Sequence, residues 1–322
     1  MFDVITLGAA VQDVFVTSKE FQLITDDSFE TGVGECFSLG SKIAVDNIVF
    51  DTGGGATNAA VTFRRSGMKV ACVTRLGKDL GGEFVLRALK KEKIDLRFVS
   101  QYPKETTGYS VVLSTGKGDR TILTYRGASQ KFTGRDIQLS ELKTKWLYIS
   151  SLAGNTTLVE KIVQYANRKR ISVAYNPGSA ELAKGRAFFA RLIPKLQVFN
   201  LNMEEAAALL GLDPVEKMRV FKELCLISKN IVVITDGVKG AYCDYFGKKF
   251  FIPTTKKTVV NTTGAGDAFG SGFVAGLMLS DDPYYALRLA LYNSENVVQK
   301  VGAKNGIFTT VPQKLHQRII AL

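Results

Sequence analysis

Residues 146–235 contain four short apolar runs: Trp146-Leu147-Tyr148-Ile149-Ser150, Ile171-Ser172-Val173-Ala174-Tyr175, Val198-Phe199-Asn200-Leu201 and Ile231-Val232-Val233-Ile234-Thr235. Each run has the length and the β-branched or aromatic content of a buried strand. Helix-like segments at 158–170, 204–210 and 215–228 separate them. Strands that alternate with helices of this length are typical of a mostly parallel sheet with helices on both faces. The sequence therefore predicts a three-layer α/β fold.

The same pattern extends in both directions from this stretch. Upstream, we expect strands at 4–10 and 70–74 and helices at 56–66 and 81–93. Downstream, the expected elements are a β-pair at 241–245 and 249–253, two long helices that start near residues 265 and 283, and a basic tail helix at 313–322. With 322 residues, the chain has the length of one large α/β unit with a small appendage.

Two segments, 13–51 and 98–127, interrupt this pattern. Both are rich in alternating apolar and polar residues and lack helical periodicity. Within the second, segments 107–113 and 120–125 flank the turn-forming run Ser114-Thr115-Gly116-Lys117-Gly118-Asp119, which predicts a hairpin. We expect the two excursions to form a small β-sheet lid (13–51 and 98–127) over an α/β domain made of 1–12, 52–97 and 128–322.

Composition excludes several classes of protein. Hydrophobic residues make up 46% and charged residues 22% of the chain, as in a globular protein with a real core. No apolar run approaches the ~20 residues of a membrane span, and the N-terminus does not look like a secretion signal. We therefore expect a cytoplasmic protein with no membrane partner. The four cysteines have no C-x-x-C spacing, and the lone His316 is expected to be solvated, which argues against a Cys/His zinc site.

The formal net charge is +12, which favours anionic ligands in general. The basic residues are scattered in short clusters such as Lys256-Lys257, and no nucleic-acid-binding motif accompanies them. The charge alone is compatible with phosphorylated small molecules, and we expect no nucleic-acid partner.

The strongest local signal for chemistry is Asn261-Thr262-Thr263-Gly264-Ala265-Gly266-Asp267 at a predicted helix start. The free N–H groups and the dipole of a helix N-terminus attract an anion, and small residues let it approach. Asp267 could take a proton from a substrate hydroxyl while those amides stabilise a transferred phosphoryl group. Equally, an acidic residue in the first turn can serve the helix dipole alone.

Three further motifs lie at strand ends or helix starts. Gly53-Gly54-Gly55-Ala56-Thr57-Asn58 offers exposed backbone and an amide suited to a polyhydroxyl ligand, or only a capped turn. Asn202-Met203-Glu204-Glu205 could hold the water shell of Mg²⁺ through Glu205, or could only begin a helix. Thr235-Asp236-Gly237-Val238-Lys239-Gly240 could cradle a nucleotide or form a turn. Neither the dinucleotide fingerprint nor the P-loop pattern is present.

Taken together, these motifs resemble those of the ribokinase-like (PfkB) sugar and nucleoside kinases, over essentially the whole chain. The resemblance rests on four motifs in the family's order: Gly53-Gly54…Asn58, Asn202…Glu205, Thr235-Asp236-Gly237 and the run from Asn261 to Asp267. It implies a ribokinase-like fold, ATP and Mg²⁺ as cofactors, and a lid that in bacterial members often forms a dimer contact.

Carried over motif by motif, the resemblance implies roles for particular residues. Asp267 would be the base and Gly264, Ala265 and Gly266 the anion hole. The substrate would be held by Asp13, Gly53, Gly54 and Asn58, with Asn176 near the cleft. The nucleotide would be bound by Asn202, Thr235, Gly237, Gly240 and, from the region around 290–306, Asn293. Glu205 would serve Mg²⁺.

The chain departs from the family's signature at Asn261, where an aspartate is usual. In relatives activated by a monovalent cation that acid helps to bind the ion, so a possible site at Asn261 and Thr263 would lack its charge. Potassium activation is therefore in doubt, whereas Asp267 is present.

Substrate cues conflict. A small sugar or sugar acid is the first expectation, and a nucleoside kinase of the adenosine type is the alternative. Arg126 could meet a carboxylate or phosphate on the substrate, while Phe15, Phe37, Ile43 and Val45 give the lid apolar character that could contact a base or simply form its core or a homodimer interface. A non-catalytic relative should have lost the base or the anion hole, and both are retained.

Overall fold

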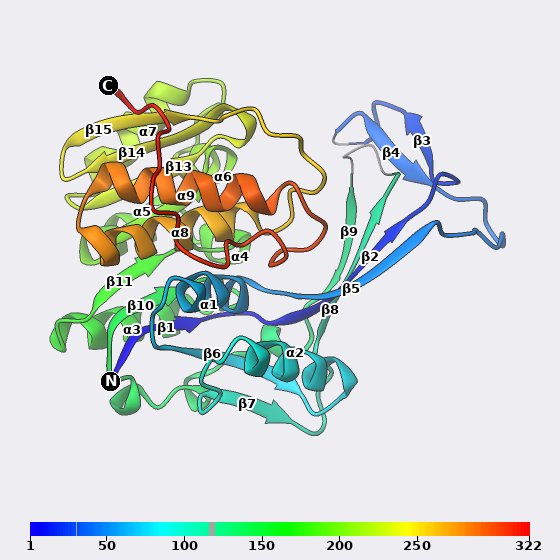
Figure 1. Ribbon diagram of the computed structural model, residues 1–322, viewed down its shortest axis with the longest axis horizontal. Helices are drawn as coiled ribbons and strands as arrows, with labels where there is room; N and C mark the ends of the chain where they lie inside the picture. Colours follow the sequence, from blue (N-terminus) through cyan, green and yellow to red (C-terminus); the bar gives the residue numbers. More distant parts are fainter. Residues whose placement is uncertain (30, 116–119) are drawn as a thin grey trace.

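The computed structural model describes residues 1–29, 31–115 and 120–322 (Figure 1). Over these residues the main sheet has ten strands, and their order is β16 (Ile320–Ala321), β15 (Lys248–Pro253), β14 (Gly240–Tyr245), β13 (Ile231–Thr235), β12 (Val198–Asn202), β11 (Ser172–Tyr175), β10 (Thr144–Ile149), β1 (Phe2–Leu7), β6 (Val70–Gly77) and β7 (Val99–Tyr102). The strands from β13 to β7 pair in parallel, whereas β14, β15 and β16 are antiparallel. The prediction of a mostly parallel sheet is confirmed.

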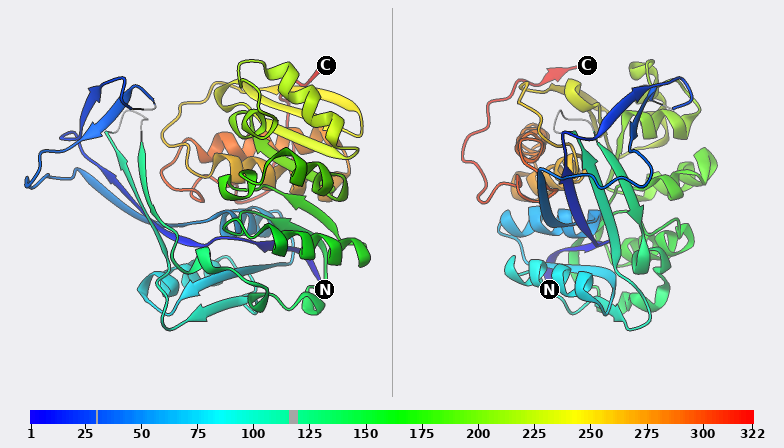
Figure 2. Two further views of the ribbon diagram at one scale, coloured as in Figure 1. Left: turned by 180° about the vertical axis from the view of Figure 1, so that it is seen from behind. Right: turned by 90° about the vertical axis from the view of Figure 1, so that its right-hand side faces the viewer.

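Helices cover both faces of this sheet (Figure 2). One face carries α1 (Gly55–Arg65), α2 (Leu80–Lys91), α8 (Ala265–Ser280) and α9 (Pro283–Val297). The other carries α3 (Thr156–Arg168), α5 (Gly185–Leu192), α6 (Met203–Leu210) and α7 (Lys217–Ile227). Successive residues of a strand point to opposite faces, so Val233 packs in the first layer and Val232 and Ile234 in the second. This two-sided burial explains why the strands appear in the sequence as continuous apolar runs.

A second, smaller sheet projects away from the body (Figure 1). Its strands, in order, are β5 (Asn47–Gly53), β2 (Val11–Thr17), β8 (Gly108–Ser114) and β9 (Thr121–Tyr125). The short pair β3 (Gln22–Thr25) and β4 (Val33–Cys36) lies at its far end. We call this sheet the lid. Antiparallel pairing of β8 with β9 agrees with the predicted hairpin, although 116–119 of its turn lie outside the described residues.

The lid has two different faces because its strands alternate. On one face Asp13 lies opposite Asp51 and Ser110, with Phe15, Val49 and Val112 further out. On the other face the side chains are apolar and exposed: Ile48, Phe50, Tyr109, Leu123 and Tyr125. The acidic face is therefore distinct from the exposed apolar one.

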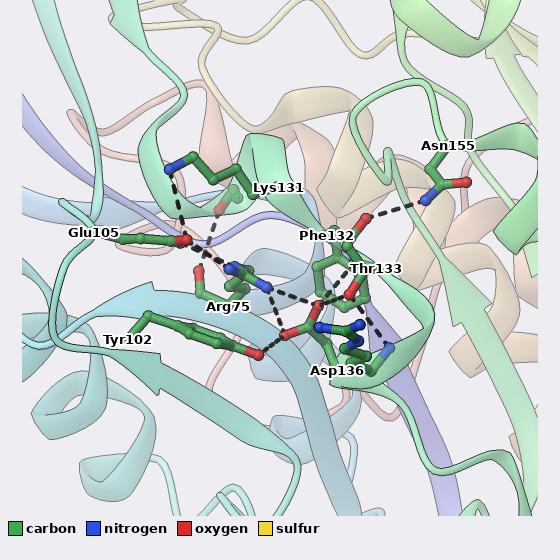
Figure 3. A network of polar contacts seen from close by, with 10 residues as sticks. Arg75, Tyr102, Glu105, Lys131, Phe132, Thr133, Asp136 and Asn155 are labelled. Carbon is green, nitrogen blue, oxygen red and sulfur yellow. Dashed lines mark hydrogen bonds and ion pairs between the residues drawn. The ribbon is translucent and has the colours of Figure 1, made fainter.

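A buried ionic network fixes the root of the lid (Figure 3). Arg75 of β6 forms paired hydrogen bonds to Glu105, just before β8, and to Asp136 in the short helix Gly134–Asp136. Its guanidinium stacks 3.6 Å from the Tyr102 ring centroid, and the Tyr102 hydroxyl donates to Asp136 at 2.6 Å. Lys131 adds an ion pair to Glu105 at 3.6 Å. The network holds the segments before and after the β8–β9 hairpin onto the main sheet.

Several local predictions were wrong. The tail does not form the predicted helix: 313–319 run as irregular chain, and Ile320–Ala321 adds a strand to β15. Leu315 and Ile319 pack against the core although the chain is not helical there, so tertiary contacts outweigh helix propensity. His316 is exposed, as expected. The helices α4 (Ser179–Leu182) and α5 were not predicted.

None of the helices formed by the described residues combines the length and the apolar content that crossing a bilayer requires.

Candidate active site

The N-terminus of α8 is the centre of the site. Gly264 has φ +81°, and a Cβ there would lie 2.6 Å from the Cβ of Ala303, so both its conformation and its surroundings require glycine. Gly266, two residues on, faces open space and is exposed. The turn thus packs against Ala303 on one side and leaves the start of a sixteen-residue helix facing a cavity on the other. The Ala265 N–H donates to the Thr262 carbonyl at 3.2 Å, within the turn. That arrangement suits an anion.

The carboxylate of Asp267 lies just inside this turn and is fixed by α1. The Asn58 side-chain amide donates to Asp267 Oδ2 at 2.8 Å. A Cβ on Gly55, at the start of α1, would be 3.3 Å from Asp267 Oδ1 and 2.7 Å from Ser150 Cβ, so the backbone approaches both closely. Burial raises the pKa of Asp267, while the Asn58 hydrogen bond and the Lys304 charge lower it. A desolvated carboxylate of this kind is a competent proton acceptor.

On the lid side of Asp267, the charges of three carboxylates act on one ammonium, although none of the three forms an ion pair with it among the described residues. Asp13 is buried, and a Cβ on Gly53 would lie only 2.0 Å from Asp13 Oδ2, so the glycine makes room for the acid. Burial raises the pKa of Asp13 to about 6, against the opposing effect of Lys304. Lys304 is buried and donates to the Thr52 carbonyl. Burial lowers its pKa to about 8, against the opposing effects of Asp51, Asp13 and Asp267. We call Asp13, Asp51, Asp267 and Lys304 the acceptor-side cluster.

The motif residues Asn202 and Glu205 form a capping box at the start of α6. The Glu205 N–H donates to Asn202 Oδ1 at 2.7 Å, and the Asn202 N–H donates to Glu205 Oε2 at 3.0 Å. Burial raises the pKa of Glu205, and the carboxylates of Glu204 and Asp267 raise it further. A carboxylate that is fixed in this way and has no cationic partner among the described residues fits a hydrated Mg²⁺, because that ion takes few protein ligands. No group of three or more acidic, cysteine or histidine side chains able to hold a metal occurs in the described part of the chain.

A cavity of about 740 Å³ opens on the other side of the α8 turn. Its lining includes six of the residues predicted to bind nucleotide or phosphate: Asn202, Thr235, Gly237, Gly240, Ala265 and Gly266. Basic side chains reach it as well, namely Arg120 from the lid and Lys256 and Lys257 from the loop after β15. That loop is anchored to α9 because the Thr255 hydroxyl donates to Glu295 Oε2 at 2.7 Å. We call this the nucleotide-side cavity.

Some predicted residues are not at these two places. Asn293 is fully buried, and its amide nitrogen donates to Ala268 O at 2.9 Å, so its predicted nucleotide contact is not supported. Asn176 donates to the Asn200 carbonyl at 2.8 Å and links β11 to β12. Arg126 is exposed directly after β9 and forms no hydrogen bond or ion pair with a described residue. Phe15 is buried, so it belongs to the lid core.

The proposed monovalent-cation residues lie in the turn before α8. Asn261 Oδ1 accepts the N–H of Thr263 at 2.8 Å, so its oxygen already serves the turn. Thr263 Oγ1 is buried and has no hydrogen-bond partner among the described residues. The pair offers one unsatisfied hydroxyl and no charge.

Seven charged side chains at the site were not among the predicted residues: Asp51, Arg120, Glu204, Lys256, Lys257, Glu295 and Lys304. The Lys256-Lys257 pair was visible as a basic cluster, and Asp51 lies two residues before the glycine motif. Lys304 belongs to none of the sequence motifs. It could not be predicted because only the folded loop after α9 brings it near Asp13.

The pfkB family carbohydrate kinase model matches residues 24–310. The chain belongs to the pfkB family of carbohydrate kinases. It is therefore an ATP-dependent kinase of the carbohydrate and nucleoside class, as predicted. Among curated relatives of this family, ribokinase of Haemophilus influenzae is 26% identical over 84% of this chain and 88% of its own. Cytidine kinase of Thermococcus kodakarensis is 27% identical over 81% of this chain and 95% of its own.

Solved structures show the same pfkB-family fold. Ribokinase from Cryptococcus neoformans var. grubii in complex with ADP aligns with a TM-score of 0.75 at 23% identity, covering 95% of this chain and 97% of that one. The ribokinase-like architecture predicted from the sequence is thereby confirmed. The relatives differ in substrate, so the acceptor has to be argued from the site.

Proposed function

We propose that this kinase transfers the γ-phosphoryl group of ATP to a hydroxyl of a small, uncharged sugar. The observation that carries the proposal is the position of Asp267 between two unlike spaces. One side is the acceptor-side cluster at the lid root, and the other is the nucleotide-side cavity lined by Gly266. A carboxylate at such a junction can serve an alcohol on one side while a phosphate lies on the other.

In the proposed reaction Asp267 accepts the proton of the attacking hydroxyl. The Asn58 hydrogen bond fixes the direction of its carboxylate, and the desolvation of the site makes it a stronger proton acceptor. The N–H groups of Gly264 and Gly266 are suited to the charge that develops on the transferred group. The predicted anion-hole role of Ala265 is weaker, because its N–H already donates to the Thr262 carbonyl at 3.2 Å. In phosphoryl transfer, positioning and charge stabilisation supply most of the catalysis, so these fixed groups are the main contribution of the chain.

ATP would occupy the nucleotide-side cavity, with Thr235, Gly237 and Gly240 along the nucleotide and Asn202 near its phosphates. Lys256, Lys257 and Arg120 outnumber the acids Glu204 and Glu295 in its lining, and the resulting positive charge suits a triphosphate. Bound Mg²⁺ would neutralise phosphate charge. Glu205 would hold it through water.

The charge of the acceptor side favours an uncharged substrate over a sugar acid or sugar phosphate. Asp13, Asp51 and Asp267 outnumber the single cation Lys304 there. An anionic group brought into this desolvated cluster would meet net repulsion. Carboxylates and the Asn58 amide are instead good partners for the hydroxyls of a neutral sugar.

A nucleoside is the second candidate. Val49 lies outward from Asp13 on the same lid face and is only partly buried, so it would offer an apolar contact to a base. One structural relative is a nucleoside kinase of Burkholderia thailandensis in complex with inosine, with a TM-score of 0.76 at 17% identity.

The test is acceptor-dependent release of ADP from Mg-ATP over pentoses, hexoses, sugar acids, sugar phosphates and nucleosides. The proposal expects the largest kcat/KM with a neutral pentose or hexose. A sugar phosphate or sugar acid as the best acceptor would contradict the charge argument, and a nucleoside as the best acceptor would select the second candidate. No stimulation by any acceptor would contradict the kinase assignment of this site.

We also propose that the exposed apolar face of the lid pairs with a second copy of the chain. Phe50, Leu123 and Tyr125 are each more than half exposed there. Exposed apolar patches of this kind mark interaction surfaces. Light scattering should give a dimer that Leu123→Lys converts to a monomer.

A further inference from the structure

Lys304 is a buried cation in a position where nothing in the sequence motifs requires one. It is 8% exposed, and its ammonium donates to the neutral carbonyl of Thr52. A buried ammonium is costly unless opposite charge surrounds it. Here the opposite charge comes from Asp13 and Asp267, the residues proposed to grip and to deprotonate the substrate, together with Asp51.

The loop that carries Lys304 is held from three directions. Ala303 packs on Gly264 of the α8 turn. Asn305 donates to Asp51 of lid strand β5 at 3.2 Å. Arg65 of α1 donates to Ile307 O at 2.7 Å. These contacts fix the ammonium relative to three parts of the site: the turn before α8, the lid, and α1, whose Asn58 is hydrogen-bonded to Asp267.

The charged and titratable groups around Lys304 and Asp267 come from several strands and helices. Lys304 faces Asp51 of β5, Asp13 of β2, Asp267 of α8 and the Cys72 thiol of β6.

The charged and titratable groups that face Asp267 are Asp13, Lys304, the Tyr148 hydroxyl of β10 and Glu205 of α6. Among them Lys304 is the cation. Without it, several acidic groups would share a desolvated space, and mutual repulsion would favour protonation of at least one.

We propose that Lys304 is a positioning residue for phosphoryl transfer, the fixed counter-cation that keeps Asp267 and Asp13 ionised side by side while the substrate is bound. This inference rests on the proposed role of Asp267 as base. It assigns to the loop after α9 a part in the chemistry that no motif indicates. A neutral side chain of similar size at position 304 should leave the fold intact but should impair proton acceptance by Asp267 at low pH.

The experiment is the pH dependence of kcat at saturating ATP and acceptor, from pH 5 to 9.5. Lys304→Met should shift the acidic limb of the pH profile to higher pH by about one pH unit, because a nearby opposite charge is lost. Activity should recover at high pH. Lys304→Gln, which can still donate to Thr52 O, should show the same shift. The matched control is Lys300→Met, which removes the same charge from an exposed position in the same loop and should leave the profile unchanged.

A complementary variant leaves Lys304 intact. Asp51→Asn removes a carboxylate that competes for the same ammonium, so the limb should move downward. Saturation with acceptor separates the effects of protonating Asp13 and Asp267. Weaker substrate binding by Asp13 raises the KM for the acceptor, whereas loss of Asp267 as the base lowers kcat. A merely structural role for Lys304 would lower activity equally at every pH.

An acidic limb that stays in place in every folded variant overturns the proposal. That outcome differs from failure of the proposed function, in which the wild-type enzyme shows no acceptor-dependent release of ADP. If both neutral variants of Lys304 fail to fold, the direction of the Asp51→Asn shift decides alone, and an upward or absent shift overturns the proposal.

Discussion

The two sides of Asp267 differ in the sign of the charge that surrounds them. On the acceptor side, acids outnumber the one cation, and burial dominates: the pKa of Asp13 rises to about 6 and that of Lys304 falls to about 8. On the nucleotide side, the lining of the open cavity of about 740 Å³ includes residues at strand ends, glycines and three basic side chains, which outnumber the acids Glu204 and Glu295. The difference suggests that the acceptor side recognises neutral hydroxyls through a few desolvated groups, whereas the nucleotide side recognises charge. Substitutions should therefore separate the two KM values.

The largest separation is expected from Asp13→Asn. Loss of a buried carboxylate that bonds substrate hydroxyls should reduce kcat/KM for the acceptor by about 100-fold or more, a cost of about 3 kcal/mol typical of a charged hydrogen bond. The KM for ATP should stay within about threefold, because Asp13 does not line the nucleotide-side cavity.

Steady-state kinetics with each substrate varied in turn would check this prediction. Asp26→Asn, an exposed acid in the far part of the lid, is the matched control. Equal losses for both substrates would show that the two sides do not act separately.

A smaller, metal-dependent effect is expected from Glu205→Gln. The capping hydrogen bonds with Asn202 can largely survive in the amide, but the charge that would attract hydrated Mg²⁺ is lost. The Mg²⁺ concentration for half-maximal activity should rise by about 10-fold, the lower range for loss of a metal-supporting group. Titration with Mg²⁺ at fixed ATP measures it, with Glu216→Gln as the exposed control. An unchanged Mg²⁺ requirement would remove Glu205 from the metal site.

The nucleotide side should respond to loss of Lys256 and Lys257 more weakly. Each alanine variant should raise the KM for ATP by about 3- to 10-fold at low salt, because a charge at the rim of an open cavity contributes about 1 kcal/mol and is screened. The effect should shrink as the ionic strength rises. Lys248→Ala is an exposed control in β15. A change confined to the acceptor KM would contradict the division into two sides.

The smallest effect concerns stability. Because burial raises the pKa of Asp13 from 3.8 to about 6, the carboxyl favours the folded state below pH 3.8, and this contribution is lost as the pH rises through 6. At pH 7 the ionised Asp13 therefore costs stability. Asp13→Asn should be more stable than the wild type at pH 7 by about 1 kcal/mol, and the difference should shrink as the pH falls from 6 toward 4. Urea unfolding at several pH values measures it, and a constant difference would contradict the burial argument.

Much of the fold could be predicted because its signals are local. The buried runs that became β10 to β13 are continuous and apolar, and the run Gly264-Ala265-Gly266 predicts the helix start that α8 shows. The lid was visible as loss of helical periodicity. Its division from the body at particular residues stays a prediction.

What escaped prediction depends on contacts between distant segments. The tail after Gln313 adds a strand to β15 because Leu315 and Ile319 find the core, which helix propensity cannot reveal. Lys304 is 252 residues from its partner Thr52 in the chain. Asn293 stands where a nucleotide contact is plausible from its position, yet the packing of α9 on α8 turns it inward. The roles assigned to the site residues likewise stay predictions.

The most direct measurement is kcat for Asp267→Asn, together with the dissociation constant of its Mg-ATP complex. The amide keeps the size of the side chain and cannot accept the proton, so kcat should fall by about 10²- to 10⁴-fold, the usual contribution of a general base. Nucleotide affinity should stay within about threefold, because the cavity and the α8 amides are intact. A variant that keeps more than about a tenth of the wild-type kcat would contradict the role of Asp267 as the base.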